Sequence, residues 1–294
     1  MTGSFGIDHP LLATYDIAAL RARLIALGFA MTAIGKHPWG TSTSLAMFDG
    51  CLLEIMGIFD PDLIDEIPAG DFRFGRHVFT HLQDREGIAL TALHSTDAHA
   101  DAARAAAAGR ACAGHLEFGR DVTLPDGRAG RTKTSLALLP DPDFPRLSFF
   151  LCQQHRPELI YVPEWLNHPN SVHGICGVTI VADLEDHGAV AARLSGLYGP
   201  GHAGKDAMEW QTANGRMRLS DPAAFERHIG PLPAGMDRPC IAAMDLVFAD
   251  RAAFLGHLTA SKTAYRDIGD GYVLTAPDAF ANTYLRFFDS SARA

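Results

Sequence analysis

The chain has 294 residues, of which 47% are hydrophobic and 20% charged, and its net charge is −9. This composition is typical of a globular protein with enough chain for one large domain or two ordinary ones. The negative charge argues against a nucleic-acid partner, because phosphate binding needs a basic surface. No apolar run is long enough to span a membrane. The start of the chain lacks the pattern of a secretion signal, and the five cysteines lack C-x-x-C spacing, so we expect reduced thiols and a cytoplasmic location.

Four segments of the chain follow one pattern, in which a short apolar run leads to an aspartate and a helix-like stretch. The aspartates are Asp16, Asp97, Asp183 and Asp250, at intervals of 81, 86 and 67 residues (97 − 16, 183 − 97, 250 − 183). Repetition of this kind indicates architecture before any single motif does. We therefore expect four structural copies.

The first copy predicts a β-α-β-β-β order. Its strands are expected at residues 5–14, 31–35, 42–48 and 51–58. Asp16 is a favourable N-cap, apolar residues then recur at helical spacing up to Leu27, and Gly28 is typical of a helix end. The Asp49-Gly50 pair predicts a tight turn between the last two strands.

The later copies predict similar elements with weaker signals. A helix is expected near residues 99–108, with strands at 132–139 and 147–153, in the second copy. The third copy predicts a helix through Val190, Leu194 and Leu197, with strands at 208–212 and 216–219, and the fourth ends with strands at 271–275 and 283–288. Residues 154–171 are rich in Pro and His and predict a linker that also touches a site.

Glu54 is the first candidate site residue. Both faces of the strand around it, residues 52–56, are apolar. A carboxylate buried there needs a partner, because an unpaired buried charge is costly. A metal ion, an arginine or a histidine would satisfy it, and a purely structural ion pair is the alternative.

His9 is the second candidate, on the first strand of the same copy. A lone strand histidine is usually an ordinary core residue, but histidine is also a common metal ligand. The first and last strands of a β-α-β-β-β unit can present His9 and Glu54 to one cation. A histidine and a carboxylate with open coordination positions suit Fe, Mn, Ni, Co or Zn in a reactive site better than a closed structural zinc.

Four β-α-β-β-β copies with His9 in the first strand and Glu54 in the last strand of copy one resemble the vicinal oxygen chelate superfamily. That superfamily includes glyoxalase I, extradiol dioxygenases and bleomycin-binding resistance proteins. The Gly-Lys-His-Pro-Trp-Gly-Thr run at residues 35–41 and the His-Pro-Asn run at 168–170 are similar to its glyoxalase-like domain branch.

The resemblance implies an α+β fold in which four βαβββ modules pair into curved mixed sheets, with the site on a concave side. It implies two glyoxalase-like domains, residues 1–165 with modules 1 and 2 and residues 166–294 with modules 3 and 4. A homodimer is also compatible with the resemblance.

The later copies depart from the ligand pattern of the first. Counted back seven residues from each aspartate, the His9 position becomes Leu90, Cys176 and Ala243. The strand of copy two that matches the Glu54 strand has no carboxylate. The missing ligands would be His94, His155 or Gln153, or oxygens of the substrate. A two-ligand site that binds metal only with substrate stays open, and so does a site without metal.

The remaining predicted site residues are substrate contacts: His37, Trp39, Thr41, His94, Gln153 and His168. An aromatic side chain among a few polar groups is typical of small-molecule pockets. Trp39 packed beneath its turn is the alternative for that residue, and an ordinary loop histidine is the alternative for His168.

The leading hypothesis from the sequence is a metal-assisted lyase or isomerase acting on a small substrate with adjacent oxygens. A divalent ion on His9 and Glu54 would stabilise an enolate, and the Glu54 carboxylate would move the proton. The competing hypothesis is a non-catalytic protein that sequesters a small molecule, and a scaffold used mainly for dimerisation is a weaker one. An extradiol dioxygenase is less favoured, because no second histidine lies in register for an iron facial triad.

Overall fold

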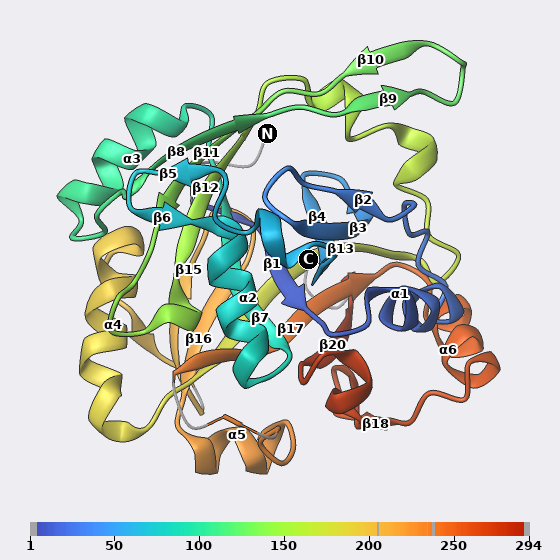
Figure 1. Ribbon diagram of the computed structural model, residues 1–294. Coiled ribbons are helices and arrows are strands. Elements are labelled where there is room, and N and C mark those ends of the chain that lie inside the picture. Colours follow the sequence, from blue (N-terminus) through green and yellow to red (C-terminus); the bar gives the residue numbers. More distant parts are fainter. Residues whose placement is uncertain (1–4, 205, 234, 237–238, 291–294) are drawn as a thin grey trace.

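The computed structural model describes residues 5–204, 206–233, 235–236 and 239–290, which form two curled eight-stranded sheets flanked by helices (Figure 1). The first sheet contains, in spatial order, β2 (Gly35–Lys36), β3 (Thr41–Phe48), β4 (Cys51–Ile58), β1 (Ile7–Ala13), β7 (Gly87–His94), β12 (Phe149–Gln154), β11 (Thr134–Leu139) and β8 (Gly114–Phe118). The second contains β14 (His202–Ala203), β15 (Met208–Gln211), β16 (Arg216–Ser220), β13 (Val172–Val181), β17 (Cys240–Phe248), β20 (Tyr284–Asp289), β19 (Gly271–Leu274) and β18 (Tyr265–Asp267).

The helices and smaller elements connect these strands. The helices are α1 (Ile17–Ala26), α2 (Phe74–Asp84), α3 (Ala98–Ala107), α4 (Leu184–Tyr198), α5 (Pro222–His228) and α6 (Arg251–Ala260). Two short hairpins are β5 (Pro68–Ala69) with β6 (Phe72–Arg73) and β9 (Asp121–Thr123) with β10 (Ala129–Arg131), and the 3-10 turns are η1 (Pro61–Leu63), η2 (Pro145–Leu147), η3 (Pro157–Leu159), η4 (Pro163–Trp165) and η5 (Pro277–Phe280). The β9–β10 hairpin projects from the body at the top of Figure 1.

The strand pairing confirms the predicted module fold. In each module the first strand pairs in parallel with the last, as in β1 with β4 and β13 with β16. Neighbouring modules then join through antiparallel pairs of first strands, β1 with β7 and β13 with β17. The fold is therefore the α+β arrangement of four paired modules, and the two sheets repeat one strand order.

Three of the four predicted N-cap aspartates mark where their helices begin. Asp16 accepts a hydrogen bond from the N–H of Ala19 at 2.9 Å, and Asp97 and Asp250 cap α3 and α6 in the same way. Asp183 precedes α4 without a side-chain cap bond. In the antiparallel pairs of first strands, Gly177 and Thr179 face Asp245 and Ala243 as His9 and Leu11 face Ala92 and Leu90. Gly177 therefore corresponds to His9, so positions counted back from Asp183 are shifted by one.

Two helices, α2 and α5, are absent from the sequence prediction. Each connects an odd-numbered module to the next one, where the repeat pattern has no element to compare. In α2, the buried residues Phe74, Val78 and Leu82 recur four apart, which places one apolar stripe against the first sheet. The helical period was therefore present in the sequence.

Alternating residues of the first sheet pack into two different cores. Leu12, Ile55 and Leu151 face a large core that also takes side chains from the second sheet and from α1, α3, α4 and α6. Leu11 and Phe150 face the opposite, concave side. The predicted domain division at 165/166 falls in the connection between the sheets and stays a prediction. Within the described residues, no helix is both long and apolar enough to cross a membrane.

Candidate functional site

A row of five polar side chains crosses four adjacent strands of the first sheet. Asp8 Oδ2 lies 3.2 Å from His94 Nδ1, and the other oxygen, Asp8 Oδ1, accepts a hydrogen bond of 2.8 Å from His9 Nδ1. On the far side of the imidazole, His9 Nε2 lies 3.1 Å from Glu54 Oε2. Thr43 donates to Glu54 Oε1 at 2.5 Å. The predicted His9–Glu54 pair is thus one link in a longer row.

A β-bulge brings Asp8 beside His9. The register passes from Ile7 opposite Leu93 to His9 opposite Ala92, so Asp8 is an extra residue in β1. In a regular strand Asp8 and His9 would point to opposite faces, but a bulge redirects a side chain. The fully buried Asp8 carboxylate therefore reaches the imidazole of its neighbour.

His9 has a carboxylate oxygen at each ring nitrogen, which favours the doubly protonated imidazolium. Burial alone would lower the pKa of His9, but the Asp8 carboxylate, and to a smaller extent Glu54, raise it above its ordinary value. For Asp8, burial opposes the shift, and His9 and His94 together hold its pKa below the usual range. His9 is thus a fixed hydrogen-bond donor beside a carboxylate.

An aromatic wall stands beside this row. The His37 ring stacks on Trp39 with centroids 4.7 Å apart. Phe118 meets the Trp39 ring edge-on at 5.3 Å, and Phe74 lies 5.3 Å from the same indole. These residues come from the turn before β3, from β8 and from α2, so the wall exists only once the sheet has curled.

Arg120 joins the two edges of the first sheet. It follows β8 at one edge and donates through Nη2 to His37 Nε2, which follows β2 at the other edge. His37 Nδ1 then bonds Thr41 Oγ1 at 2.9 Å. Burial and the Arg120 charge hold the pKa of His37 well below its usual value, so His37 is neutral and accepts from the guanidinium.

His9, Glu54, Arg120 and the aromatic wall line a cavity of about 650 Å³ on the concave side of the first sheet, a size typical of small-molecule sites. Its apolar lining includes Leu11, Met31, Leu45, Met47, Leu52, Met56, Leu136 and Ile160. The β9–β10 hairpin contributes Val122, and the predicted linker contributes Leu159 and Trp165. Because Val122, Leu159 and Trp165 pack together, hairpin and linker form one cover.

The structure places only part of the predicted site residues at this cavity. His9, Glu54, His37 and Trp39 line it, while Thr41 supports His37 from behind. His94 contacts the row through Asp8 and does not reach the cavity lining.

Two predicted substrate contacts lie elsewhere. Gln153 accepts from the N–H of Ala98 and donates to Thr96, which ties it to the start of α3. Its neighbours Cys152 and Gln154 line the cavity instead, as strand alternation requires. His168 accepts from the N–H of Ala30 and donates to the Met47 carbonyl. Both of its ring nitrogens are therefore occupied by backbone groups of the first module.

Asp8 and Arg120 are the main site residues that the sequence prediction missed. Asp8 stands next to His9, but only a bulge brings the two side chains together. Arg120 lies in a stretch without strong periodicity, so nothing in the sequence signals that it meets His37.

The donor set falls short of a three-ligand metal centre. Sheet register pairs Leu11 with Glu54 in the first module and Ala92 with Phe150 in the second. The positions equivalent to His9 and Glu54 in module 2 are therefore Leu90 and Phe150, which have no ligand atom. Among the residues that the structure describes, no group of three or more His, Cys, Asp or Glu is arranged to hold a metal ion. Two side chains alone do not fit a resident ion.

The second sheet has an ion-pair cluster where the first has its row. Register places Arg218 and Arg286 at the positions of Glu54, and Gly177 and Ala243 at those of His9. Counting seven residues back from Asp183 gave Cys176 at the His9 position, but the strand register puts Gly177 there. Both arginines pair with the fully buried Asp245. The charges of this cluster are paired with one another, which leaves none of them for a ligand. We therefore place the candidate site on the first sheet.

The fold has clear relatives among solved structures. A hypothetical protein from Staphylococcus aureus aligns with a TM-score of 0.69 at 11% identity, covering 96% of this chain and 98% of that one. A triple mutant of 4-hydroxymandelate synthase from Streptomyces coelicolor aligns at 0.61 and 14% identity, covering 98% and 93%. A xylose isomerase-like TIM barrel/4-hydroxyphenylpyruvate dioxygenase fusion protein aligns at 0.56 and 13% identity, covering 98% of this chain and 49% of that one. At these identities the likeness shows the fold alone.

Sequence comparison identifies the family. No curated protein matches the chain, but the glyoxalase-like domain family matches residues 7–198. This match covers the whole first sheet with its row of polar residues, and continues through α4. The chain belongs to the glyoxalase-like domain family.

Proposed function

We propose that the protein is an isomerase or lyase that moves a proton on a small carbonyl or hydroxy-carbonyl substrate. The observation that carries this proposal is the Asp8–His9–Glu54 arrangement at a mostly apolar cavity, with His9 bonded to Asp8 at 2.8 Å and lying 3.1 Å from Glu54. A carboxylate beside a fixed cation in a largely apolar cavity is suited to proton transfer.

The chemistry needs only the side chains of this chain. The Glu54 carboxylate takes a proton from the carbon next to the substrate carbonyl. The electron pair of that C–H bond moves to the carbonyl oxygen, and the resulting enolate accepts a hydrogen bond from His9 Nε2–H. In an isomerase acting on a hydroxy-carbonyl, protonated Glu54 returns its proton to the former carbonyl carbon while the neighbouring hydroxyl gives its proton to the enolate oxygen, so that carbonyl and hydroxyl exchange places. In a lyase, the enolate re-forms the carbonyl and expels a group, with its bonding pair, from the carbon on the other side of the deprotonated one. Asp8 holds the imidazole in place throughout.

Hydrogen exchange with solvent tests the proposal before the natural substrate is known. We expect the protein to catalyse deuterium incorporation next to the carbonyl of at least one compound in a panel of small 2-hydroxyketones and 2-oxo acids, followed by proton NMR in deuterated buffer. A panel without catalysed exchange would contradict proton transfer at a carbonyl.

Members of the vicinal oxygen chelate superfamily, which the sequence resembles, are commonly metal-dependent, so metal binding needs its own measurement. Because the part of the chain that the structure describes brings no group of three ligands together and pairs only His9 with Glu54 at the cavity, we expect Mn²⁺, Ni²⁺, Co²⁺, Zn²⁺ or Fe²⁺ to leave the melting temperature of the substrate-free protein unchanged. Metal content after purification without chelator is measured alongside. A rise in melting temperature that disappears in both His9→Ala and Glu54→Ala would instead establish a metal centre.

The aromatic wall favours a second candidate, sequestration of an aromatic compound without turnover. Under this alternative Trp39→Ala removes the stacking surface and weakens ligand binding roughly 10-fold or more, while Glu54→Gln leaves binding intact and no exchange activity exists to lose. Calorimetric titration of both variants, together with the exchange assay, separates the two functions.

A further inference from the structure

Arg120 is a cation at the cavity whose charge is not paired within the described part of the chain. Its guanidinium contacts the neutral imidazole of His37. No described carboxylate forms an ion pair with it, and the adjacent Asp121 pairs with Arg131 at 2.8 Å. By contrast, the buried Arg110 and the half-buried Arg218 both pair with aspartates.

The chain holds Arg120 in place from both sides of its backbone. The Arg120 N–H donates to Thr132 Oγ1 at 2.9 Å, and its carbonyl accepts from the Thr132 N–H at 2.9 Å. The His37 contact then fixes one arm of the guanidinium. Nη1 and Nε make no hydrogen bond to the described residues, so the fork has donors left for a ligand.

We propose that Arg120 binds the carboxylate of an aromatic acid, whose ring lies against the stacked His37–Trp39 pair and Phe118. This assignment rests on the proposed function, since it names the substrate class of the same cavity. A planar guanidinium recognises a carboxylate through parallel hydrogen bonds, and the mostly apolar lining suits a ring. Glu54 lines the same cavity as Arg120, so an acid held by Arg120 shares the cavity with the proposed base.

The test compares two probes of the same shape, 2-naphthylacetate and its neutral amide, 2-naphthylacetamide, by calorimetric titration. We expect the wild-type protein to prefer the acid. Arg120→Met should reduce that preference roughly 10- to 100-fold, the range for losing a charged hydrogen-bonded pair. Arg120→Lys, which keeps the charge without the fork, should retain part of it.

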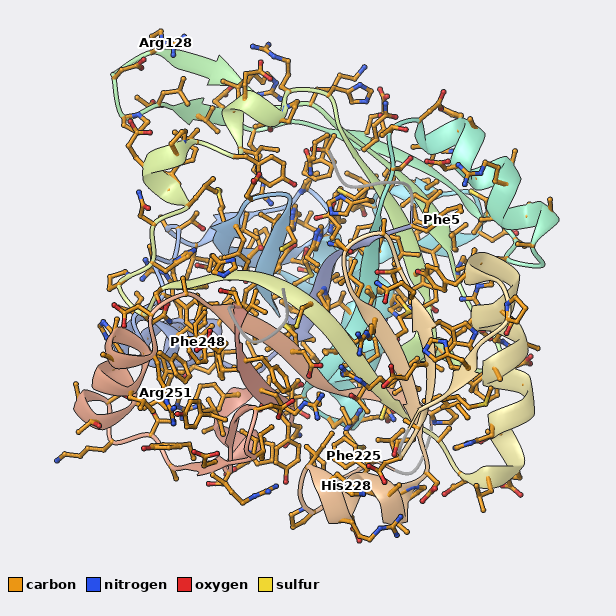
Figure 2. All side chains as sticks on the ribbon, turned by 180° about the vertical axis from the view of Figure 1, so that it is seen from behind. Phe5, Arg128, Phe225, His228, Phe248 and Arg251 are labelled. Carbon is orange, nitrogen blue, oxygen red and sulfur yellow. The ribbon has the colours of Figure 1, made fainter. Side chains whose placement is uncertain are left out.

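Arg128→Met is the matched control. Arg128 lies at the outer end of the β9–β10 hairpin (Figure 2), pairs with Asp126 and has a side chain 74% exposed, so its loss should not change the preference. Glu54→Gln should keep or strengthen the preference for the acid, because it removes a negative charge from the cavity, and this separates the inference from the proton-transfer proposal. The inference is overturned if neither probe binds or if the wild type binds both equally. It is also overturned if Arg120→Met keeps the wild-type preference for the acid, or if Arg120→Lys retains no more of that preference than Arg120→Met does.

Discussion

Glu54→Gln should slow the exchange reaction by about 100- to 10,000-fold, the usual contribution of a positioned general base. Glutamine has nearly the shape of glutamate, and its amide can still bond Thr43 and His9, but it cannot take a proton at neutral pH. The loss is measured as the rate of deuterium incorporation with the best compound of the panel, at saturating concentration.

The melting temperature of the variant shows whether its fold is intact, because Glu54 is buried. Glu117→Gln is the matched control: this carboxylate lies on β8 of the same sheet, bonds Ser135 at 2.8 Å, and is exposed outside the cavity lining. A folded Glu54→Gln protein with wild-type exchange would remove Glu54 from the reaction and with it the proposed function.

Asp245→Asn should have the largest effect on stability of the changes considered, lowering the free energy of unfolding by about 3–5 kcal/mol. Asp245 is fully buried and accepts from Arg286 Nε at 2.7 Å and Nη2 at 2.9 Å, and it also pairs with Arg218. Removing its charge leaves two largely buried guanidinium groups without their common partner. Urea unfolding at neutral pH gives the difference from the wild type.

The pH dependence of this difference tests its cause. Burial would raise the pKa of Asp245, but the two arginines hold it below the ordinary value of 3.8. A carboxylate with a lowered pKa stabilises the fold above its unfolded value and loses that contribution as the pH falls through its folded value. The difference between wild type and Asp245→Asn should therefore be constant above about pH 5 and shrink below 3.8.

Asp126→Asn provides the comparison for a surface pair. Asp126 bonds Arg128 at 2.7 Å in an exposed turn, where ion pairs contribute little, so its unfolding curve should match the wild type. Equal effects of the two substitutions would show that the buried cluster is not what stabilises the second sheet.

The sequence alone determined the module architecture and the centre of the site. Apolar runs and helix-capping aspartates act within a few residues, so Asp16, Asp97 and Asp250 mark the same junction in the sequence and in the structure. His9 and Glu54 were predictable together because the first and last strands of one module pair in parallel. Comparison of the copies also showed that the second module has Leu90, which has no ligand atom, at the position equivalent to His9.

Tertiary structure decided what surrounds that pair. A bulge turned Asp8 toward His9, and the curl of an eight-stranded sheet brought Arg120 to His37 from the opposite edge. The same closure tied His168 to backbone groups far along the chain. These contacts depend on a β-bulge and on the approach of sheet edges that are far apart in the sequence. Neither feature leaves a periodic pattern in the local sequence. The repeat therefore predicted which strands build the cavity, and only the folded sheet determined which charges meet in it.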